Sequence, residues 1–245
     1  MLVIMARSTV LAKLRMLRSL FRRLLRLTLW FALISAALVL LLRWLPPPGS
    51  ALMLERKLQS WGSGEPIDLQ RSWRPWAELP DDLKIAVIAA EDQKFAEHWG
   101  FDLDAIQSAL AHNERGGSLR GASTLSQQVA KNLFLWSDRS WLRKGLEVWF
   151  TGLIELCWSK QRILEVYLNT VEWGDGIFGA EAASQYFFHK SAAALTRREA
   201  ILLVGVLPSP SLRNPAMPTP QMLKVVPVID KRMEVLASRS ACVGT

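Results

Sequence analysis

The sequence predicts a mainly α-helical domain preceded by one N-terminal transmembrane helix. Apolar residues recur at helical spacing in one segment after another beyond residue 80, and residues 27–42 form an uninterrupted uncharged run. Charge is also divided unevenly along the chain. Of the 30 basic residues, eight lie in residues 1–54, which hold no acid, so the rest of the chain balances 22 basic residues against 22 acidic ones. The excess of positive charge therefore belongs to the N-terminus, and we expect no nucleic-acid partner.

The uncharged run becomes a transmembrane helix over residues 24–45 if Arg26 and Arg43 reach the two membrane interfaces with their charged ends. Seven positive charges precede the run and one follows it, which predicts a cytoplasmic N-terminus and a single pass across the membrane. A cleaved signal peptide is the alternative, but no small-x-small cleavage site follows the run. We therefore expect a basic cytoplasmic segment at residues 1–23 and an uncleaved anchor at 24–45.

Residues 46–74 are predicted to be a linker or juxtamembrane segment. Three prolines stiffen its start, and the stretch from 51 to 79 places Trp61, Trp73 and Trp76 among Gly and Pro. These tryptophans either face the membrane or lie over the core of the domain, and the sequence leaves both alternatives open.

The first helix of the domain is predicted over residues 80–92 and ends in two carboxylates, Glu91 and Asp92. Pro80 suits the first turn, and apolar residues on all faces indicate a buried helix. Glu91 should then stand at the rim of the core, near the negative end of the helix. Both effects raise the pKa of a carboxyl group, which a general base near neutral pH requires. The alternative is that these carboxylates are the solvated end of an ordinary helix.

A second helix, 102–113, is expected to lead into a mobile polar loop, 113–122, which contains three glycines. After the loop, Thr124 and Gln127 have the spacing of a capping box, which is a purely structural explanation of this stretch. The same stretch also suits an anion site, because free amide hydrogens, hydroxyl groups and Lys131 converge at the start of a helix. Both interpretations stay open on these residues alone.

A further helix is predicted to begin after Asp138 or Ser140 and to end near Trp158. On another face of it, basic and acidic side chains at i, i+1 and i+4 are typical of a modest exposed ion-pair cluster, formed by Arg143, Lys144 and Glu147. Its buried face is expected to consist of Leu142, Leu146, Trp149, Phe150 and Leu153. Helices are also predicted over 159–173, 180–188 and 196–207, with a glycine turn at 174–179 and a weak helix in the C-terminal tail, 221–245.

The glycine turn matches the G-x-G-x-x-G pattern of dinucleotide sites, and we reject this match. Such a site follows a buried β-strand within a βαβ unit, whereas the residues before Gly174 have helical spacing and no second unit appears. Cys157 and Cys242 suggest neither a disulfide framework nor a metal site, and the three histidines lack metal-ligand spacing.

Several of these stretches, taken together, resemble the peptidoglycan glycosyltransferases that polymerise lipid II, in their single-domain, membrane-anchored form. They occur in the family's order and cover most of residues 75–215. One departure is Ala122, where many members have a second glycine. The matching stretches are Glu91-Asp92 with Phe95, His98 and Gly100; Gly121-Ala122-Ser123-Thr124 with Gln127-Gln128 and Lys131-Asn132; Arg143-Lys144 with Glu147; and residues 162–169 followed by Glu172, Gly174 and Gly179.

The resemblance implies a lysozyme-like helical glycosyltransferase domain at residues 75–220, on the periplasmic face of the inner (cytoplasmic) membrane. The donor would be a glycan on undecaprenyl diphosphate, and the acceptor the 4-hydroxyl group of an incoming lipid II. Carried over to this chain, Glu91 is the base that takes the hydroxyl proton, and the α-linkage inverts to β-1,4 with release of undecaprenyl diphosphate. A positioned base of this kind contributes about 10² to 10⁴ in rate.

The leaving diphosphate is multiply charged, so cations and hydrogen-bond donors are expected at a second place. The resemblance makes Glu147 the second catalytic glutamate and a ligand for a divalent metal, Mg²⁺ or Mn²⁺. Its implied partners are lipid II, the nascent glycan strand, the membrane, and cell-division or cell-wall synthesis proteins. The residues expected to bind diphosphate and sugar are Ser123, Thr124, Gln127, Gln128, Lys131, Asn132, Arg139, Arg143 and Lys144.

Three other functions were weighed against this one. A lysozyme-like hydrolase or lytic transglycosylase has no diphosphate to stabilise, so the set of cations argues against it. A catalytically idle membrane scaffold would not need Glu91 and Glu147. A bifunctional penicillin-binding protein requires a Ser-x-x-Lys motif and a transpeptidase domain, and this chain has neither the motif nor the length.

Overall fold

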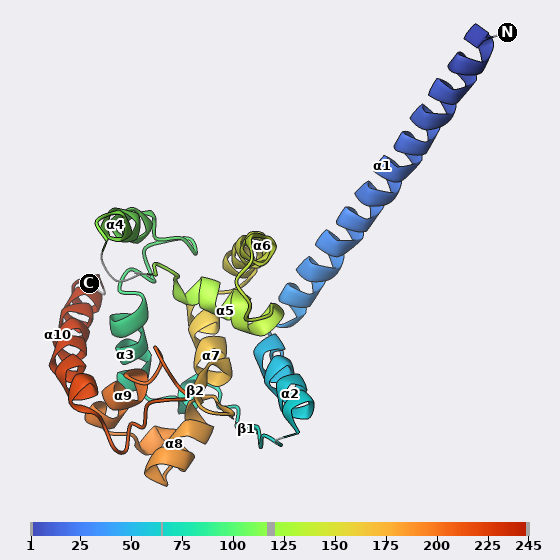
Figure 1. Ribbon diagram of the computed structural model, residues 1–245. Helices are drawn as coiled ribbons and strands as arrows, with labels where there is room; N and C mark the ends of the chain where they lie inside the picture. Colours follow the sequence, from blue (N-terminus) through green and yellow to red (C-terminus); the bar gives the residue numbers. More distant parts are fainter. Residues whose placement is uncertain (1, 65, 117–120, 244–245) are drawn as a thin grey trace. The chain divides into compact units, whose positions relative to one another are not determined.

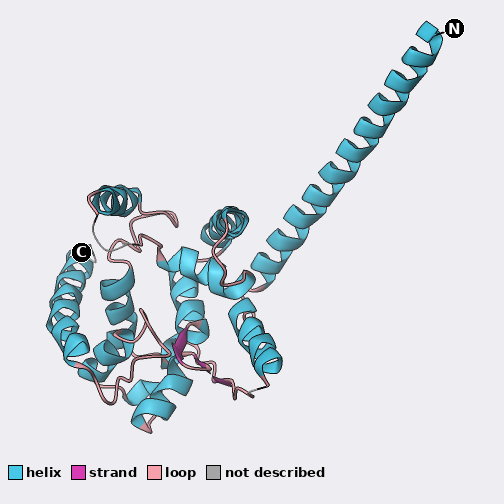
Figure 2. Ribbon diagram, in the orientation of Figure 1, coloured by secondary structure: helices cyan, strands magenta, loops and turns pink. Residues whose placement is uncertain are grey.

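The computed structural model describes residues 2–64, 66–116 and 121–243, so part of the predicted glycine loop, residues 117–120, lies outside the described residues. The chain forms two compact units, Met1–Trp44 and Leu45–Thr245. Helices dominate both, and the second also contains a small sheet (Figure 2). The prediction of a mainly α-helical protein is confirmed.

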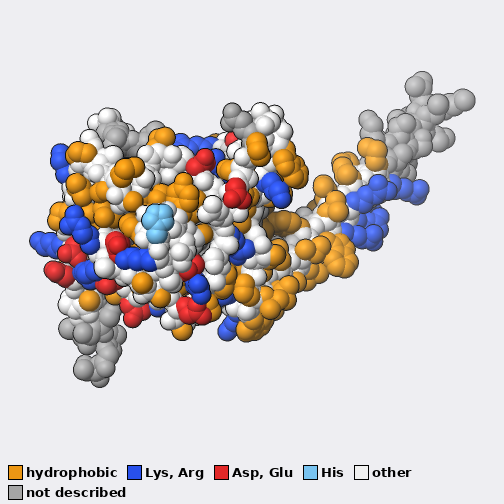
Figure 3. All heavy atoms as spheres, turned by 90° about the horizontal axis from the view of Figure 1, so that it is seen from below, with side chains coloured by type: hydrophobic (Ala, Val, Ile, Leu, Met, Phe, Trp, Pro, Cys, Tyr) orange, Lys and Arg blue, Asp and Glu red, His pale blue; other side chains and the backbone are white. Residues whose placement is uncertain are grey.

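The first unit contains one long helix, α1 (Leu2–Leu41). Its segment Arg15–Leu41 has a mean hydropathy of 2.2 and is long and apolar enough to cross a membrane. Figure 3 shows basic side chains gathered on the part of this helix that precedes its apolar band. The helix ends before the predicted boundary at residue 45, because the next residues turn ahead of three prolines, which lack the amide hydrogen that a helix needs.

The second unit is a bundle in which two groups of helices pack together (Figure 1). Helix α5 packs against α2, α6 and α7, whereas α3 packs against α9 and α10. The elements are α2 (Ala51–Ser63), β1 (Gln70–Arg71), the 3₁₀ turn η1 (Trp76–Glu78), α3 (Asp81–Glu91), α4 (Leu103–Glu114), α5 (Leu125–Phe134), α6 (Trp141–Cys157), α7 (Lys160–Thr170), β2 (Glu172–Gly174), β3 (Ile177–Phe178), α8 (Ala180–Phe188), η2 (Ala192–Ala194), α9 (Arg197–Val204) and α10 (Pro220–Val243).

The predicted helix 159–173 and glycine turn 174–179 are partly wrong. Helix α7 ends at Thr170, and β2 and β3 then form an antiparallel pair, with β1 parallel to β3 at the other edge. Gly179 follows β3 at φ +83°, where its amide donates to the Val171 carbonyl oxygen at 3.1 Å and a Cβ atom would lie 3.0 Å from the Asn169 carbonyl oxygen. The G-x-G-x-x-G segment therefore makes a hairpin, which agrees with the rejection of a dinucleotide site.

Two segments predicted to lie outside the domain are integral parts of it. The linker 46–74 contains helix α2 and strand β1, and Arg56 of α2 binds Glu172 of β2 with an Nη2–Oε1 distance of 2.8 Å. The tail from 221 forms α10, whose Met222 and Met233 are buried. The sequence did not indicate that α2 and α10 belong to the domain, because each buries only a few apolar residues and their partners are distant in the chain.

The predicted buried face of α6 is partly wrong, although Phe150 is buried as expected. Leu142 is 70% exposed and Trp149 39% exposed, whereas Arg143 and Glu147 are buried. The helix turns its charged face inward because these two side chains neutralise each other there. Helical spacing reports apolar faces and cannot identify a buried ion pair.

Candidate active site

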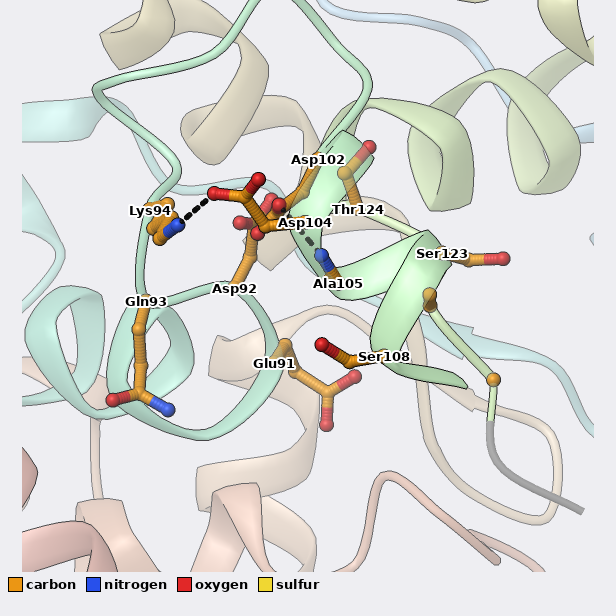
Figure 4. A pocket seen from close by; sticks show the side chains of 12 residues that line it. Glu91, Asp92, Gln93, Lys94, Asp102, Asp104, Ala105, Ser108, Ser123 and Thr124 are labelled. Carbon is orange, nitrogen blue, oxygen red and sulfur yellow. Dashed lines mark hydrogen bonds and ion pairs between the residues drawn. The ribbon is translucent and has the colours of Figure 1, made fainter. Parts of the chain in front are cut away.

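Glu91 is the last residue of α3 and lines a cavity of about 410 Å³. Asp92 and Lys94 of the following loop, Ser108 of α4 and Ser123 line the same cavity (Figure 4). Burial raises the pKa of the Glu91 carboxyl group, and the neighbouring Asp92 carboxylate raises it further. The cavity thus contains a carboxylate whose proton affinity is increased, as the sequence predicted.

A hydrogen-bonded chain extends from Glu91 into the core. The side-chain amide of Gln128 donates to Glu91 Oε2 at 3.0 Å, and its Oε1 accepts from the hydroxyl of Tyr167 at 3.1 Å. Burial, followed by the charge of Glu91, raises the pKa of Tyr167 well above its ordinary value, so the hydroxyl stays a donor. Gln128 was expected to bind diphosphate or sugar; its side chain here holds Glu91, and its contact with substrate stays a prediction. Tyr167 was not singled out as a site residue, because its helical spacing is that of a core residue.

Asp92 fastens the end of α3 to the start of α5. Its Oδ2 accepts the backbone amide of Leu125 at 3.0 Å, and its Oδ1 lies 2.9 Å from His98 Nε2. Because His98 Nδ1 accepts from the Gly100 amide at 3.1 Å, the Nε2 atom carries the proton and donates to Asp92. Asp92 therefore sets the position of Glu91 relative to α5, a role that the sequence alone did not indicate.

The capping box at the start of α5 is present in both directions. Thr124 accepts from the Gln127 amide, and the Gln127 side chain accepts from the Thr124 amide at 3.1 Å. The Thr124 hydroxyl also donates to the Gly100 carbonyl oxygen at 2.7 Å. The Thr124 hydroxyl group thus donates to one partner and accepts from another within the fold, and its contact with substrate stays a prediction. Ser123, by contrast, is exposed in the cavity of Glu91.

A second cavity, of about 260 Å³, adjoins the first. Both are lined by Ala122 and Ser123, and the second is also lined by Gln127 and Lys144. The loop residues before α5 therefore lie between the Glu91 cavity and a basic side chain of α6. This arrangement leaves room for one extended ligand with an uncharged end and an anionic end.

The remaining predicted cations gather around one carboxylate. Glu147 is buried, with its Oε2 2.7 Å from Arg143 Nη1 and its Oε1 2.5 Å from Lys144 Nζ. Burial lowers the pKa of Lys131; the charge of Glu147 opposes this, and the charges of Arg143, Lys144 and Arg139 add to it. We call the four basic residues, Lys131, Arg139, Arg143 and Lys144, the cation cluster.

The cation cluster has one carboxylate for four positive charges, so it attracts an anion. Among the described residues, no side chain accepts a hydrogen bond from Lys131, although its ammonium group is largely buried. An anionic ligand would supply that missing partner. Asn132 lies on the same face of α5 as Gln128, and only 7% of its surface is exposed.

The protein side chains at this site offer few ligands for a divalent metal ion. Within the part of the chain that the structure describes, no group of three His, Cys, Asp or Glu residues could hold a metal ion. Both oxygens of Glu147 are already bound by cations.

Comparison with known proteins shows which family this chain is similar to. The family model described as Transglycosylase matches residues 59–236. A protein of Ectopseudomonas mendocina (strain ymp) named biosynthetic peptidoglycan transglycosylase is 74% identical over 195 residues, which cover 80% of this chain and 81% of that protein. Proteins of the same name from Pseudomonas putida (strain W619) and Stutzerimonas stutzeri (strain A1501) are 63% identical over 225 residues and 72% identical over 195 residues, covering 92% and 80% of this chain and 95% and 81% of those proteins.

Proposed function

Because this chain belongs to the transglycosylase family of biosynthetic peptidoglycan glycosyltransferases, we propose that it polymerises lipid II with Glu91 as the base and the cation cluster as the diphosphate site. The reaction it catalyses is glycan strand polymerisation in cell-wall synthesis. The residue roles are our proposal and rest on the geometry of the two adjoining cavities.

In the proposed reaction, one proton moves to Glu91 and one leaving group departs toward the cation cluster. Glu91 accepts the proton of the acceptor 4-hydroxyl group while that oxygen attacks the anomeric carbon of the donor. The bond from this carbon to the diphosphate oxygen breaks, and attack from the opposite face inverts the linkage from α to β. The electron pair leaves on undecaprenyl diphosphate, whose charge the cation cluster stabilises.

One observation supports this proposal most strongly: Gln128 binds Glu91, and Lys131 follows it by one helical turn on α5. A rigid helix thus sets the distance between the base and the diphosphate site. A gel assay of purified protein with fluorescent lipid II tests it. Glu91→Gln should lower the rate by about 10² to 10⁴, and Lys131→Ala by about 10² to 10³. Residual activity of Glu91→Gln within tenfold of wild type would remove Glu91 as the base.

A divalent ion fits the proposed site if the substrate diphosphate provides most of the ligands of the ion. When bound, Mg²⁺ or Mn²⁺ would neutralise diphosphate oxygens, and Glu147 could give it one carboxylate oxygen. A titration of activity against metal concentration tests this. If Glu147→Gln leaves the titration unchanged, Glu147 serves only to hold Arg143 and Lys144 in place.

We also propose that the domain works at the periplasmic surface of the inner membrane, with its N-terminus in the cytoplasm. The polyprenyl tails of both substrates support this location, as does α1. The tryptophans of residues 51–79 were expected either to face the membrane or to lie over the core, and they differ in this respect. Trp73 lies 5.3 Å from the Arg162 guanidinium and Trp76 lies 4.2 Å from the Lys84 ammonium, so both pack on the domain, whereas Trp61 is 68% exposed. Protein partners remain a prediction.

A further inference from the structure

The loop between α5 and α6, residues 135–140, contains or leads into three of the four residues of the cation cluster. It contains Arg139 and leads directly into the turn of α6 that holds Arg143 and Lys144. Residues 137–140 are exposed, so core packing does not hold them. Hydrogen bonds must therefore fix the path of this loop.

Three residues of the loop have such bonds. The Asp138 carbonyl oxygen accepts from Arg143 Nε at 2.8 Å, and the Ser140 side chain caps α6 by accepting from the Arg143 amide at 3.2 Å. Ser137 is held from outside the loop, because its amide donates to Glu55 Oε2 at 2.8 Å and its hydroxyl group donates to Glu55 Oε1. Glu55 lies 82 residues earlier in the chain.

Helix α2, which contains Glu55, is itself firmly attached. Arg56 donates to Glu172 Oε1 through Nε at 3.0 Å and through Nη2 at 2.8 Å. Met53 is buried, and α2 packs against α5. Adjacent residues of α2 thus bind the sheet with Arg56 and the loop with Glu55, so Glu55 is a fixed point for the loop.

We propose that Glu55 is a positioning residue for the diphosphate site. A carboxylate that accepts both a backbone amide and a hydroxyl group makes strong, directional hydrogen bonds. It holds Ser137, and through the next residues it keeps Arg139 and Arg143 at the cation cluster. The inference rests on the proposed function, because it names what organises the same site.

The experiment uses the full chain in detergent and inorganic pyrophosphate as the probe. Glu55→Ala should weaken pyrophosphate binding, measured by calorimetry, by about 5- to 10-fold, and should speed amide hydrogen exchange in residues 136–140. Glu55→Gln keeps one acceptor oxygen, so its effect should be smaller. The matched control is Glu234→Gln on α10, an exposed glutamate outside the site, which should change neither readout.

A double-mutant cycle separates positioning from general destabilisation. Ser137→Ala removes one of the two bonds that Ser137 donates to Glu55, so its effect on pyrophosphate binding and that of Glu55→Ala should be less than additive. Unchanged pyrophosphate binding in Glu55→Ala, with or without faster exchange in the loop, would overturn the inference. So would full additivity.

Lipid II polymerisation distinguishes this inference from the proposed function. Glu55→Ala should raise the KM for lipid II and leave the acidic limb of the pH profile unchanged, because Glu91 is untouched. If wild type fails to polymerise lipid II while pyrophosphate binding still depends on Glu55, the proposed function is wrong and the positioning role stands. If wild type polymerises lipid II and Glu55→Ala matches it in KM, the positioning role is wrong.

Discussion

Burial changes the two central ionisable residues in opposite directions. It raises the pKa of Glu91, which makes that carboxylate a stronger base at neutral pH, and it lowers the pKa of Lys131. A bound diphosphate would favour the charged form of Lys131 again, so this lysine gains positive charge as it gains its ligand. Both residues were selected from the sequence, but the causes of their pKa shifts required the packing around them.

The raised pKa of Glu91 predicts a more stable Glu91→Gln variant. Glu91 has an ordinary pKa of 4.5 when unfolded, so between pH 4.5 and its raised folded pKa the folded protein holds a proton that the unfolded chain has lost, and wild-type stability falls as pH rises through this window. Glutamine avoids this cost and can still bond to Gln128. Thermal unfolding should show the variant more stable at pH 7, with the difference vanishing below pH 4.5. A variant less stable than wild type at both pH values would contradict the shift.

Gln128 should control the pH dependence of the reaction. Its hydrogen bond lowers the pKa of Glu91, so Gln128→Leu should raise that pKa further. The base would then be protonated at higher pH, and the acidic limb of the kcat/KM profile should move upward. Tyr167→Phe is the control, since it leaves the bond from Gln128 to Glu91 in place and should move the limb less. A larger shift in Tyr167→Phe than in Gln128→Leu would refute this assignment.

Among the helices, α5 organises the site. Its first residue is bound by Asp92, its first turn by the capping box, and its middle by Glu91 and Tyr167 through Gln128. The sequence predicted this helix and its cap from Thr124 and Gln127 alone, because both interactions are local. It could not show that the Thr124 hydroxyl is occupied by Gly100, which lies 24 residues away.

A matched pair of caps tests the importance of α5. Thr124→Ala and Thr196→Ala each remove the threonine of a capping box, at the start of α5 and of α9 respectively. Both should lower the free energy of unfolding by about 1 kcal/mol. Only Thr124→Ala should also lower kcat/KM, because α5 alone holds Gln128 and Lys131. Equal activity in the two variants would show that the cap of α5 is structural only.

The whole molecule combines a helix long and apolar enough to cross a membrane with a domain that exposes apolar side chains on several helices, among them α2 and α6. On α2 these are Leu54, Leu58 and Trp61, spaced along one face, and on α6 they include Trp141 at 93% exposure and Leu142 at 70%. Exposed apolar residues in such groups are typical of surfaces that meet a membrane or a partner. A reaction between two lipid-linked substrates favours the membrane.

Leu142→Gln should therefore impair the enzyme in lipid vesicles without unfolding it. The KM for lipid II in vesicles should rise about 3- to 10-fold, because losing one inserted leucine weakens contact with the interface by about 1 kcal/mol. Leu212→Gln, at a residue that is 84% exposed outside these two helices, is the control and should have no effect. The idea fails if both variants behave alike in vesicles.

The sequence by itself determined the long apolar N-terminal helix, most of the other helices, the cap of α5 and the candidate base. Each of these depends on residues within a few positions of one another, where helical spacing and charge already constrain the structure. Only the tertiary structure decided that Gln128 orients Glu91, that α6 buries its charged face, and that α2 and α10 belong to the domain. Those outcomes depend on partners far apart in the chain, as with Gln128, which is 37 residues from Glu91 and 39 from Tyr167. Packing brings such partners together, and no local pattern encodes the pairing.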